Sequence, residues 1–144
     1  MIVLDCCAAV EIARETDEGR ALQSLMLTDE KIISSELLYI ELASTFRKYV
    51  KAGIMDHSQA LARMGIALGL VNNFVPLQEN YIEAFHQAIV SDHSVYDFLY
   101  LTLARRNSAT LVSVDKRLNS LCDELGVDRL HEIDWIGLEA EDEN

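Results

Sequence analysis

Met1-Ile2-Val3-Leu4-Asp5 opens the chain, and Thr110-Leu111-Val112-Ser113-Val114-Asp115 repeats its pattern near the other end. Each stretch is an apolar run that ends on an aspartate. Runs of this length, rich in β-branched residues, are typical of fully buried strands. In an open parallel α/β sheet, ligands bind outside the carboxyl ends of the strands. We therefore expect Asp5 and Asp115 to face one crevice.

Two carboxylates in one crevice repel each other unless a positive charge lies between them, and a hard divalent cation is the usual solution. Each aspartate also has a purely structural interpretation. Asp5 precedes a predicted helix, where Asp is a preferred N-cap residue. Asp115 suits a turn or a cap. The pair is more informative than either residue alone.

The periodicity predicts strands that alternate with helices. Strands are expected over 1–5, 31–34, 73–77 and 110–114, with a possible edge strand at 127–133, and helices over 8–14, 20–27, 35–52, 56–70, 78–90, 94–106 and 117–125. This alternation favours a parallel sheet with right-handed crossovers. We predict an α/β fold, a Rossmann-like three-layer sandwich around a central, mostly parallel sheet. One domain is expected over 1–138, followed by a frayed acidic tail at 139–144.

The composition restricts the classes of function. The chain has 144 residues and a net charge of −12, which disfavours non-specific nucleic-acid binding unless metal ions and local basic patches offset it. The acidic surface also suits a basic protein partner. No apolar stretch reaches membrane-spanning length, and no basic segment precedes the first apolar run. The three cysteines and four histidines show no zinc spacing, and we expect reduced thiols and a cytoplasmic location.

Two further acids lie on predicted helices. Glu41 flanks an apolar helix stripe, which places it either partly buried or at the rim of a cleft. From position alone, a solvated residue paired with Arg47 or Lys48 is the somewhat better interpretation. Asp97 could complete a capping box with Ser94. It also begins a helix that is apolar almost all round, which places it near the interior. Less favoured acidic candidates are Asp92 and Glu11.

Four segments together resemble a known family. They are Ile2–Asp5, Glu36–Ala43, Ser94–Ala104 and Leu111–Leu118, which contain the acids Asp5, Glu41, Asp97 and Asp115 in order. The segments resemble PIN-domain ribonucleases, and among these the VapC toxins of toxin–antitoxin pairs. Two departures stand out. Cys6 and Cys7 replace a Ser or Thr that often follows the first aspartate, and Ser35 replaces a common proline.

The resemblance implies a PIN-like fold and metal-dependent cleavage of RNA, often tRNA or rRNA. It assigns the four acids to catalysis, with Asp5, Asp97 and Asp115 as ligands of Mg²⁺, or of Mn²⁺ as a substitute. Ser113 matches a supporting hydroxyl. It further implies a small antitoxin that crosses the active-site groove. In this function, the phosphate contacts would come from basic residues near the predicted site, and our candidates are Lys48, Arg105, Arg106, Lys116 and Arg117.

Several alternatives stay open from the sequence. The basic candidates are equally well explained as ordinary surface charge. Apolar residues over 54–71 exceed what one buried helix face needs, which fits either a homodimer contact or a core role. A homodimer, or a larger toxin–antitoxin assembly, is our expectation. The rival function is a non-catalytic PIN-like module that only binds protein or RNA.

Overall fold

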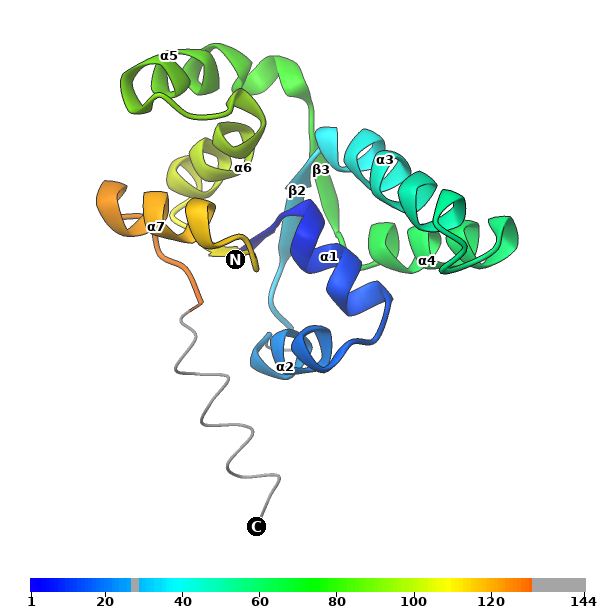
Figure 1. The fold of residues 1–144 in the computed structure, drawn as a ribbon. Helices are drawn as coiled ribbons and strands as arrows, with labels where there is room; N and C mark the ends of the chain where they lie inside the picture. The colour runs from blue at the N-terminus through cyan, green and yellow to red at the C-terminus, as the bar shows by residue number, and fades with distance from the viewer. Residues whose placement is uncertain (27–28, 131–144) are drawn as a thin grey trace.

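The computed structural model describes residues 1–26 and 29–130. Within these ranges strands and helices alternate along the chain (Figure 1). In chain order the elements are β1 (Ile2–Leu4), α1 (Cys6–Ala13), α2 (Asp17–Leu25), β2 (Ile32–Ser35), α3 (Leu37–Lys51), α4 (His57–Gly69), β3 (Asn73–Val75), the 3₁₀ helix η1 (Leu77–Glu79), α5 (Tyr81–Ser91), α6 (Val95–Arg106), β4 (Thr110–Val112) and α7 (Lys116–Leu125).

The four described strands form one parallel sheet in the order β3-β2-β1-β4. Val3 of the central β1 pairs with Ile33 of β2 and Leu111 of β4. The two strands that precede Asp5 and Asp115 are therefore neighbours, as predicted, and their carboxyl ends lie at one edge of the sheet. The predicted α/β fold with a parallel central sheet is confirmed.

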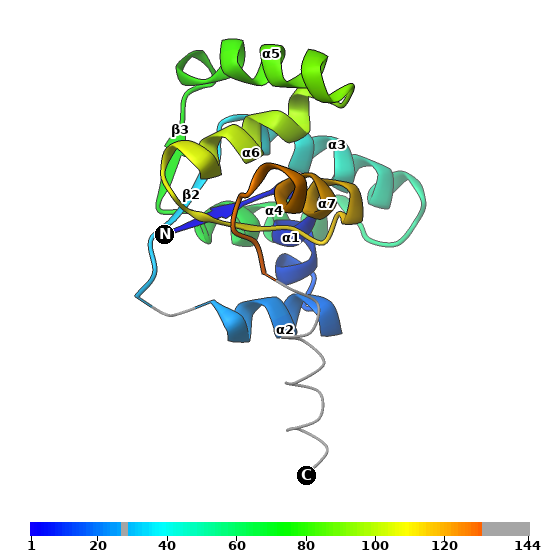
Figure 2. The same cartoon turned by 90° about the vertical axis from the view of Figure 1, so that its left-hand side faces the viewer.

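Helices cover both faces of the sheet and make two cores. Val3 points into one core, which it shares with residues of α5, α6 and α7. Ile2 and Leu4 point the opposite way, into a core made with α1, α2, α3 and α4. This is the alternation that a β-strand imposes on its side chains. Figures 1 and 2 show the two groups of helices on opposite sides of the strands.

Helix α6 is buried around its whole circumference, as its apolar sequence predicts. Every residue from Phe98 to Ala104 is buried. Asp97, directly before this stretch, is half-buried, with 27% of its side chain exposed. The burial of α6 therefore holds Asp97 at the border between the core and solvent.

Two predicted helices differ from the observed ones. The helix expected over 20–27 begins earlier, at Asp17, because the Thr16 hydroxyl accepts a hydrogen bond from the Gly19 N–H and caps it. The helix expected over 78–90 is interrupted at Asn80. The buried Asn80 amide donates to the Leu99 carbonyl (2.9 Å) and to Thr102 Oγ1 (3.0 Å), contacts with α6 that local sequence does not reveal.

The C-terminal predictions are only partly open to comparison. The strand predicted over 110–114 ends at Val112. Of the edge strand expected over 127–133, the described part shows one isolated parallel bridge, between Leu111 and Arg129. Residues 131–133, the domain end expected at 138 and the tail at 139–144 lie outside the described residues.

The apolar segment 54–71 divides between core and surface. Its packed residues, which lie against the α1–α4 core, are Met55, Ala60, Met64, Ala67, Leu68, Leu70 and Val71. Ile54, Leu61 and Ile66 are exposed. None of the helices in the described part of the chain is long and apolar enough to cross a membrane.

Candidate active site

The four predicted acids line one cleft of about 240 Å³ at the carboxyl edge of the sheet. Asp5 follows β1, and Asp115 follows β4 across two intervening residues. Glu41 comes from the first half of α3, and Asp97 from the first turn of α6. Four separate segments therefore bring carboxylates to the place where the parallel topology predicts a ligand site.

Asp5 is the most buried of the four, with 4% exposed. Its carboxylate accepts hydrogen bonds from the Ala8 N–H at 3.0 Å, from the Ser113 hydroxyl at 2.5 Å and from the Cys7 thiol at 3.1 and 3.2 Å. Burial raises the pKa of Asp5 to about 7, and the charge of Glu41 adds to this rise. Asp5 is thus both the N-cap of α1 and a carboxyl group poised between its two protonation states near neutral pH.

Glu41 contacts α6 rather than the basic residues of its own helix. Its Oε1 accepts a hydrogen bond of 2.6 Å from the hydroxyl of Tyr100, which is buried. Burial raises the pKa of Glu41, and the nearby charge of Asp97 raises it further, while the Tyr100 hydrogen bond lowers it. The alternative pairing of Glu41 with Arg47 or Lys48 is not formed.

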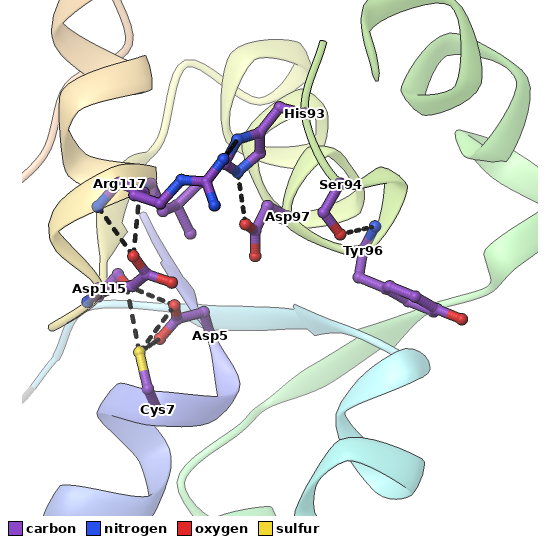
Figure 3. Close-up of polar contacts among 10 residues, drawn as sticks. Asp5, Cys7, His93, Ser94, Tyr96, Asp97, Asp115 and Arg117 are labelled. Atoms are coloured by element: carbon purple, nitrogen blue, oxygen red, sulfur yellow. Dashed lines mark hydrogen bonds and ion pairs between the residues drawn. The ribbon is translucent and has the colours of Figure 1, made fainter. Parts of the chain in front are cut away.

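Asp97 is held by a histidine and, through it, by an arginine (Figure 3). Asp97 Oδ2 lies 2.7 Å from His93 Nε2, and His93 Nδ1 lies 3.1 Å from an Arg117 nitrogen. A guanidinium can only donate, so Nδ1 accepts and Nε2–H donates to Asp97. The expected capping box is incomplete: Ser94 accepts from the Tyr96 N–H, and the Asp97 carboxylate turns to His93 instead.

Asp115 caps α7, as its structural interpretation predicts. Its Oδ1 accepts from the Arg117 N–H at 2.9 Å and from the Leu118 N–H at 3.3 Å. Its own N–H donates to Ser113 Oγ at 3.0 Å, and the Ser113 hydroxyl reaches Asp5. Ser113 therefore ties the segment after β4 to the carboxylate after β1, and the cap and cleft positions of Asp115 coexist.

The comparisons with known proteins show the family and the fold of this chain. The PIN domain model matches residues 2–124, a span that contains all four acids. The chain belongs to the PIN domain family. No curated protein matches it. The crystal structure of PAE2754 from Pyrobaculum aerophilum is similar, with a TM-score of 0.68, 20% identity, and coverage of 96% of this chain and 89% of that one. At this identity the likeness concerns the fold alone.

PIN domains are in general nucleases and typically use divalent metal ions. The cleft offers carboxylate oxygens, the ligands that Mg²⁺ and Mn²⁺ prefer. Burial is the main cause of the raised pKa values of Asp5 and Glu41, and the negative charge of a neighbouring carboxylate raises each of them further. In the described residues, however, no three acidic, His or Cys side chains stand close enough to hold one ion directly. The oxygen donors fit the chemistry of such an ion, which the carboxylates would hold through water or after a movement of their side chains.

The five basic candidates fall into three places. Arg117 and Lys116 begin α7 beside the cleft, and Arg117 contacts His93. Lys48 is exposed on α3 and does not line the cleft. Arg105 and Arg106 lie at the far end of α6 from Asp97, where both pair with Glu83 at 2.7 Å. The structure therefore brings Lys116 and Arg117, but not Arg105 and Arg106, to the acids.

The two less favoured acidic candidates differ. Glu11 lines the cleft and accepts a hydrogen bond from the Thr16 hydroxyl. Asp92 ends α5 in a left-handed conformation and does not line the cleft. Sequence reasoning missed Tyr100 and His93. Tyr100 lies three residues after Asp97 on the same helix, and His93 lies four residues before it, just outside the start of that helix. This closeness in sequence was a usable signal. It also missed the Cys7 thiol, which contacts Asp5 and Ser113.

Proposed function

We propose that this PIN domain is a metal-dependent endoribonuclease that cleaves RNA, and that it serves as the toxin of a toxin–antitoxin pair. The observation that carries the nuclease proposal is the convergence of Asp5, Glu41, Asp97 and Asp115 on one cleft from four separate elements. A structural cap explains Asp5 and Asp115, but it explains neither Glu41 nor the shared cleft.

We assign the roles of the side chains from the resemblance to the family and from their contacts. Asp5, Asp97 and Asp115 would hold Mg²⁺ directly or through water. When bound, the ion supplies positive charge against the phosphate oxygens of the substrate. Glu41 takes the proton of the attacking water: its Oε1 is engaged by Tyr100, so Oε2 is the accepting oxygen. A raised pKa makes Glu41 a better base than an ordinary carboxylate.

Positioning residues keep this set in place. Ser113 and Cys7 hydrogen-bond Asp5, and His93 orients Asp97. Burial raises the pKa of the Cys7 thiol, so it stays protonated and donates to the carboxylate. In the family, a Ser or Thr hydroxyl often follows the first aspartate. Here the Cys7 thiol donates a hydrogen bond to Asp5 in place of such a hydroxyl.

The toxin role rests on the resemblance of the acidic segments to VapC toxins. It entails a small antitoxin whose basic side chains reach the carboxylates, a partner that the charge of −12 suits. We also propose a homodimer, and a larger toxin–antitoxin assembly built from it, with the exposed Leu61 and Ile66 as candidate contact residues.

The decisive test is cleavage of total tRNA by the purified protein with Mg²⁺ or Mn²⁺, beside Asp5→Asn and Asp97→Asn. Asn keeps the size of each side chain and removes its charge. We expect cleavage that needs the metal and is lost in both folded variants. Binding of RNA or of a basic partner without cleavage of tRNA or rRNA would contradict the enzyme and favour the binding module.

A further inference from the structure

A second hollow, outside the acidic cleft, contains two arginines. It has a volume of about 220 Å³ and is lined by Arg14, Ile54, Met55, Gln59 and Arg63. Arg14 is the C-cap residue of α1, the helix that begins at Asp5. Because α1 has eight residues, its two ends lie about 12 Å apart at about 1.5 Å per residue.

A side-chain contact joins a residue of the acidic cleft to a residue of this second hollow. The Arg14 guanidinium lies 4.5 Å from the centroid of the Tyr49 ring, and its NH1 donates to the Tyr49 hydroxyl at 3.3 Å. Tyr49, from α3, lines the acidic cleft. The contact between Tyr49 and Arg14 therefore links the lining of the cleft to the lining of the second hollow.

Arg63 reaches the same place from α4. Its NH1 donates to the Ala13 carbonyl at 2.8 Å, in the last turn of α1. The partial negative charge at the carboxyl end of a helix favours nearby cations. Both guanidinium groups are half-buried and positioned by protein contacts that use only some of their five N–H donors.

These arginines are poorly neutralised compared with others in the chain. Arg105, Arg106 and Arg129 each lie within 2.8 Å of a carboxylate. In the described residues Arg14 has no carboxylate within 4.0 Å. Arg63 lies 3.9 Å from Glu15, whose side chain is 71% exposed. An ion pair this long and this exposed does little to neutralise the charge of Arg63. Two such cations in one hollow stand out in a protein of net charge −12.

We infer that Arg14 and Arg63 bind backbone phosphates of the RNA strand that extends from the acidic cleft, with the Tyr49 ring at the turn between the two hollows. This inference rests on the proposed nuclease function. The planar guanidinium fork matches phosphate geometry and can bind it through two parallel hydrogen bonds. Lys116 and Arg117 start α7 directly after Asp115, whereas Arg14 lies at the carboxyl end of α1, the end away from Asp5.

The test measures binding of poly(U) to the non-cleaving Asp97→Asn protein, alone and with Arg14→Gln, Arg63→Gln or both, over a range of NaCl. On single strands each lost phosphate contact lowers the slope of log K against log salt by about 0.7. We expect the double variant to bind several-fold more weakly, with a slope smaller by about 1.4. Glu15→Gln, which removes the opposing charge, binds more tightly.

Arg20→Gln is the matched control, because it removes one charge from the exposed surface of α2, beside Asp17. It leaves the slope unchanged. Arg14→Lys distinguishes a lost phosphate contact from a folding defect, because it keeps the positive charge and removes the planar guanidinium group. We expect it to lose less affinity for poly(U) than Arg14→Gln does. In the cleaving protein, Arg14→Gln raises KM for RNA with kcat retained.

The outcomes separate this inference from the nuclease proposal. Metal-dependent cleavage by the wild type, together with an unchanged salt slope in the double variant, would overturn the phosphate subsite alone. If the double variant loses the ability to bind poly-L-glutamate but still binds poly(U) as the wild type does, the inference is overturned as well. That result would assign the hollow to an acidic protein partner. If poly(U) does not bind at all, the inference is also wrong. Absence of any RNA cleavage is a failure of the nuclease proposal.

Discussion

Asp5 shows how one residue serves the fold and the site at once. It caps α1 because its side chain accepts from the Ala8 N–H, and it lies in the cleft because α1 starts at the end of β1. Burying a carboxylate opposes its ionisation. The favourable hydrogen bonds from Ser113 and Cys7 only partly offset this effect, since the pKa of Asp5 still rises to about 7.

Asp5 therefore makes the stability of the metal-free protein depend on pH. Between its ordinary pKa of 3.8 and the folded value of about 7, the folded state binds more protons than the unfolded chain. Raising the pH through this window lowers the free energy of unfolding. The total loss approaches about 4 kcal/mol once the pH is above the pKa of Asp5 in the folded state. We expect Asp5→Asn, measured by urea unfolding in EDTA, to gain stability over the wild type from pH 4 to pH 7. A difference independent of pH would contradict this account.

Tyr100 acts through Glu41. Tyr100→Phe keeps the buried ring and removes the hydroxyl that donates to Oε1, a bond to a charged group worth about 1.5–3 kcal/mol. Because this bond lowers the pKa of Glu41, its loss moves the acid limb of the pH–rate profile to higher pH. We expect kcat/KM for RNA to fall roughly tenfold. The exposed Tyr81→Phe is the control, and an unshifted acid limb in Tyr100→Phe would count against Glu41 as the base.

The contacts between elements explain where sequence-based prediction succeeds and where it fails. The extent of α6 is predictable because apolar residues on every side of a helix indicate burial. The break at Asn80 is not predictable, because the side chain that causes it bonds to α6, about twenty residues further on. Local propensity does not contain that partner.

Gly19 sets the approach of α2 to α1. A Cβ built at Gly19 would lie 2.0 Å from the Glu11 carbonyl oxygen, so Gly19→Ala forces the two helices apart. We expect a loss of about 1–3 kcal/mol in the free energy of unfolding. Gly65→Ala is the matched control: nothing lies within 4 Å of its Cβ on α4, and Ala there should stabilise by about 0.5–1 kcal/mol. Equal effects in urea unfolding would show that α1 and α2 are not close-packed.

At the scale of the whole molecule, charge determines how the protein responds to ions. The net charge is −12, and five carboxylates, the four predicted acids and Glu11, line one cleft. An ion that binds only the folded state raises stability by about 2.7 kcal/mol at one hundred times its Kd. We expect Mg²⁺ to raise the Tm of the wild type and to have little effect on Asp5→Asn. NaCl of the same ionic strength is the control, and an equal rise in NaCl would indicate general screening rather than a site.

The sequence by itself determined the alternation of strands and helices, the parallel sheet, the buried α6 and the four acids, because hydrophobic periodicity and strand-terminal aspartates are local patterns. Tertiary structure alone decided which side chains meet. The contacts of His93 with Arg117, Tyr100 with Glu41, and Arg14 with Tyr49 join residues that are 24 to 59 positions apart. Such contacts depend on how crossovers place helices on the sheet, and no pattern within one element encodes that placement.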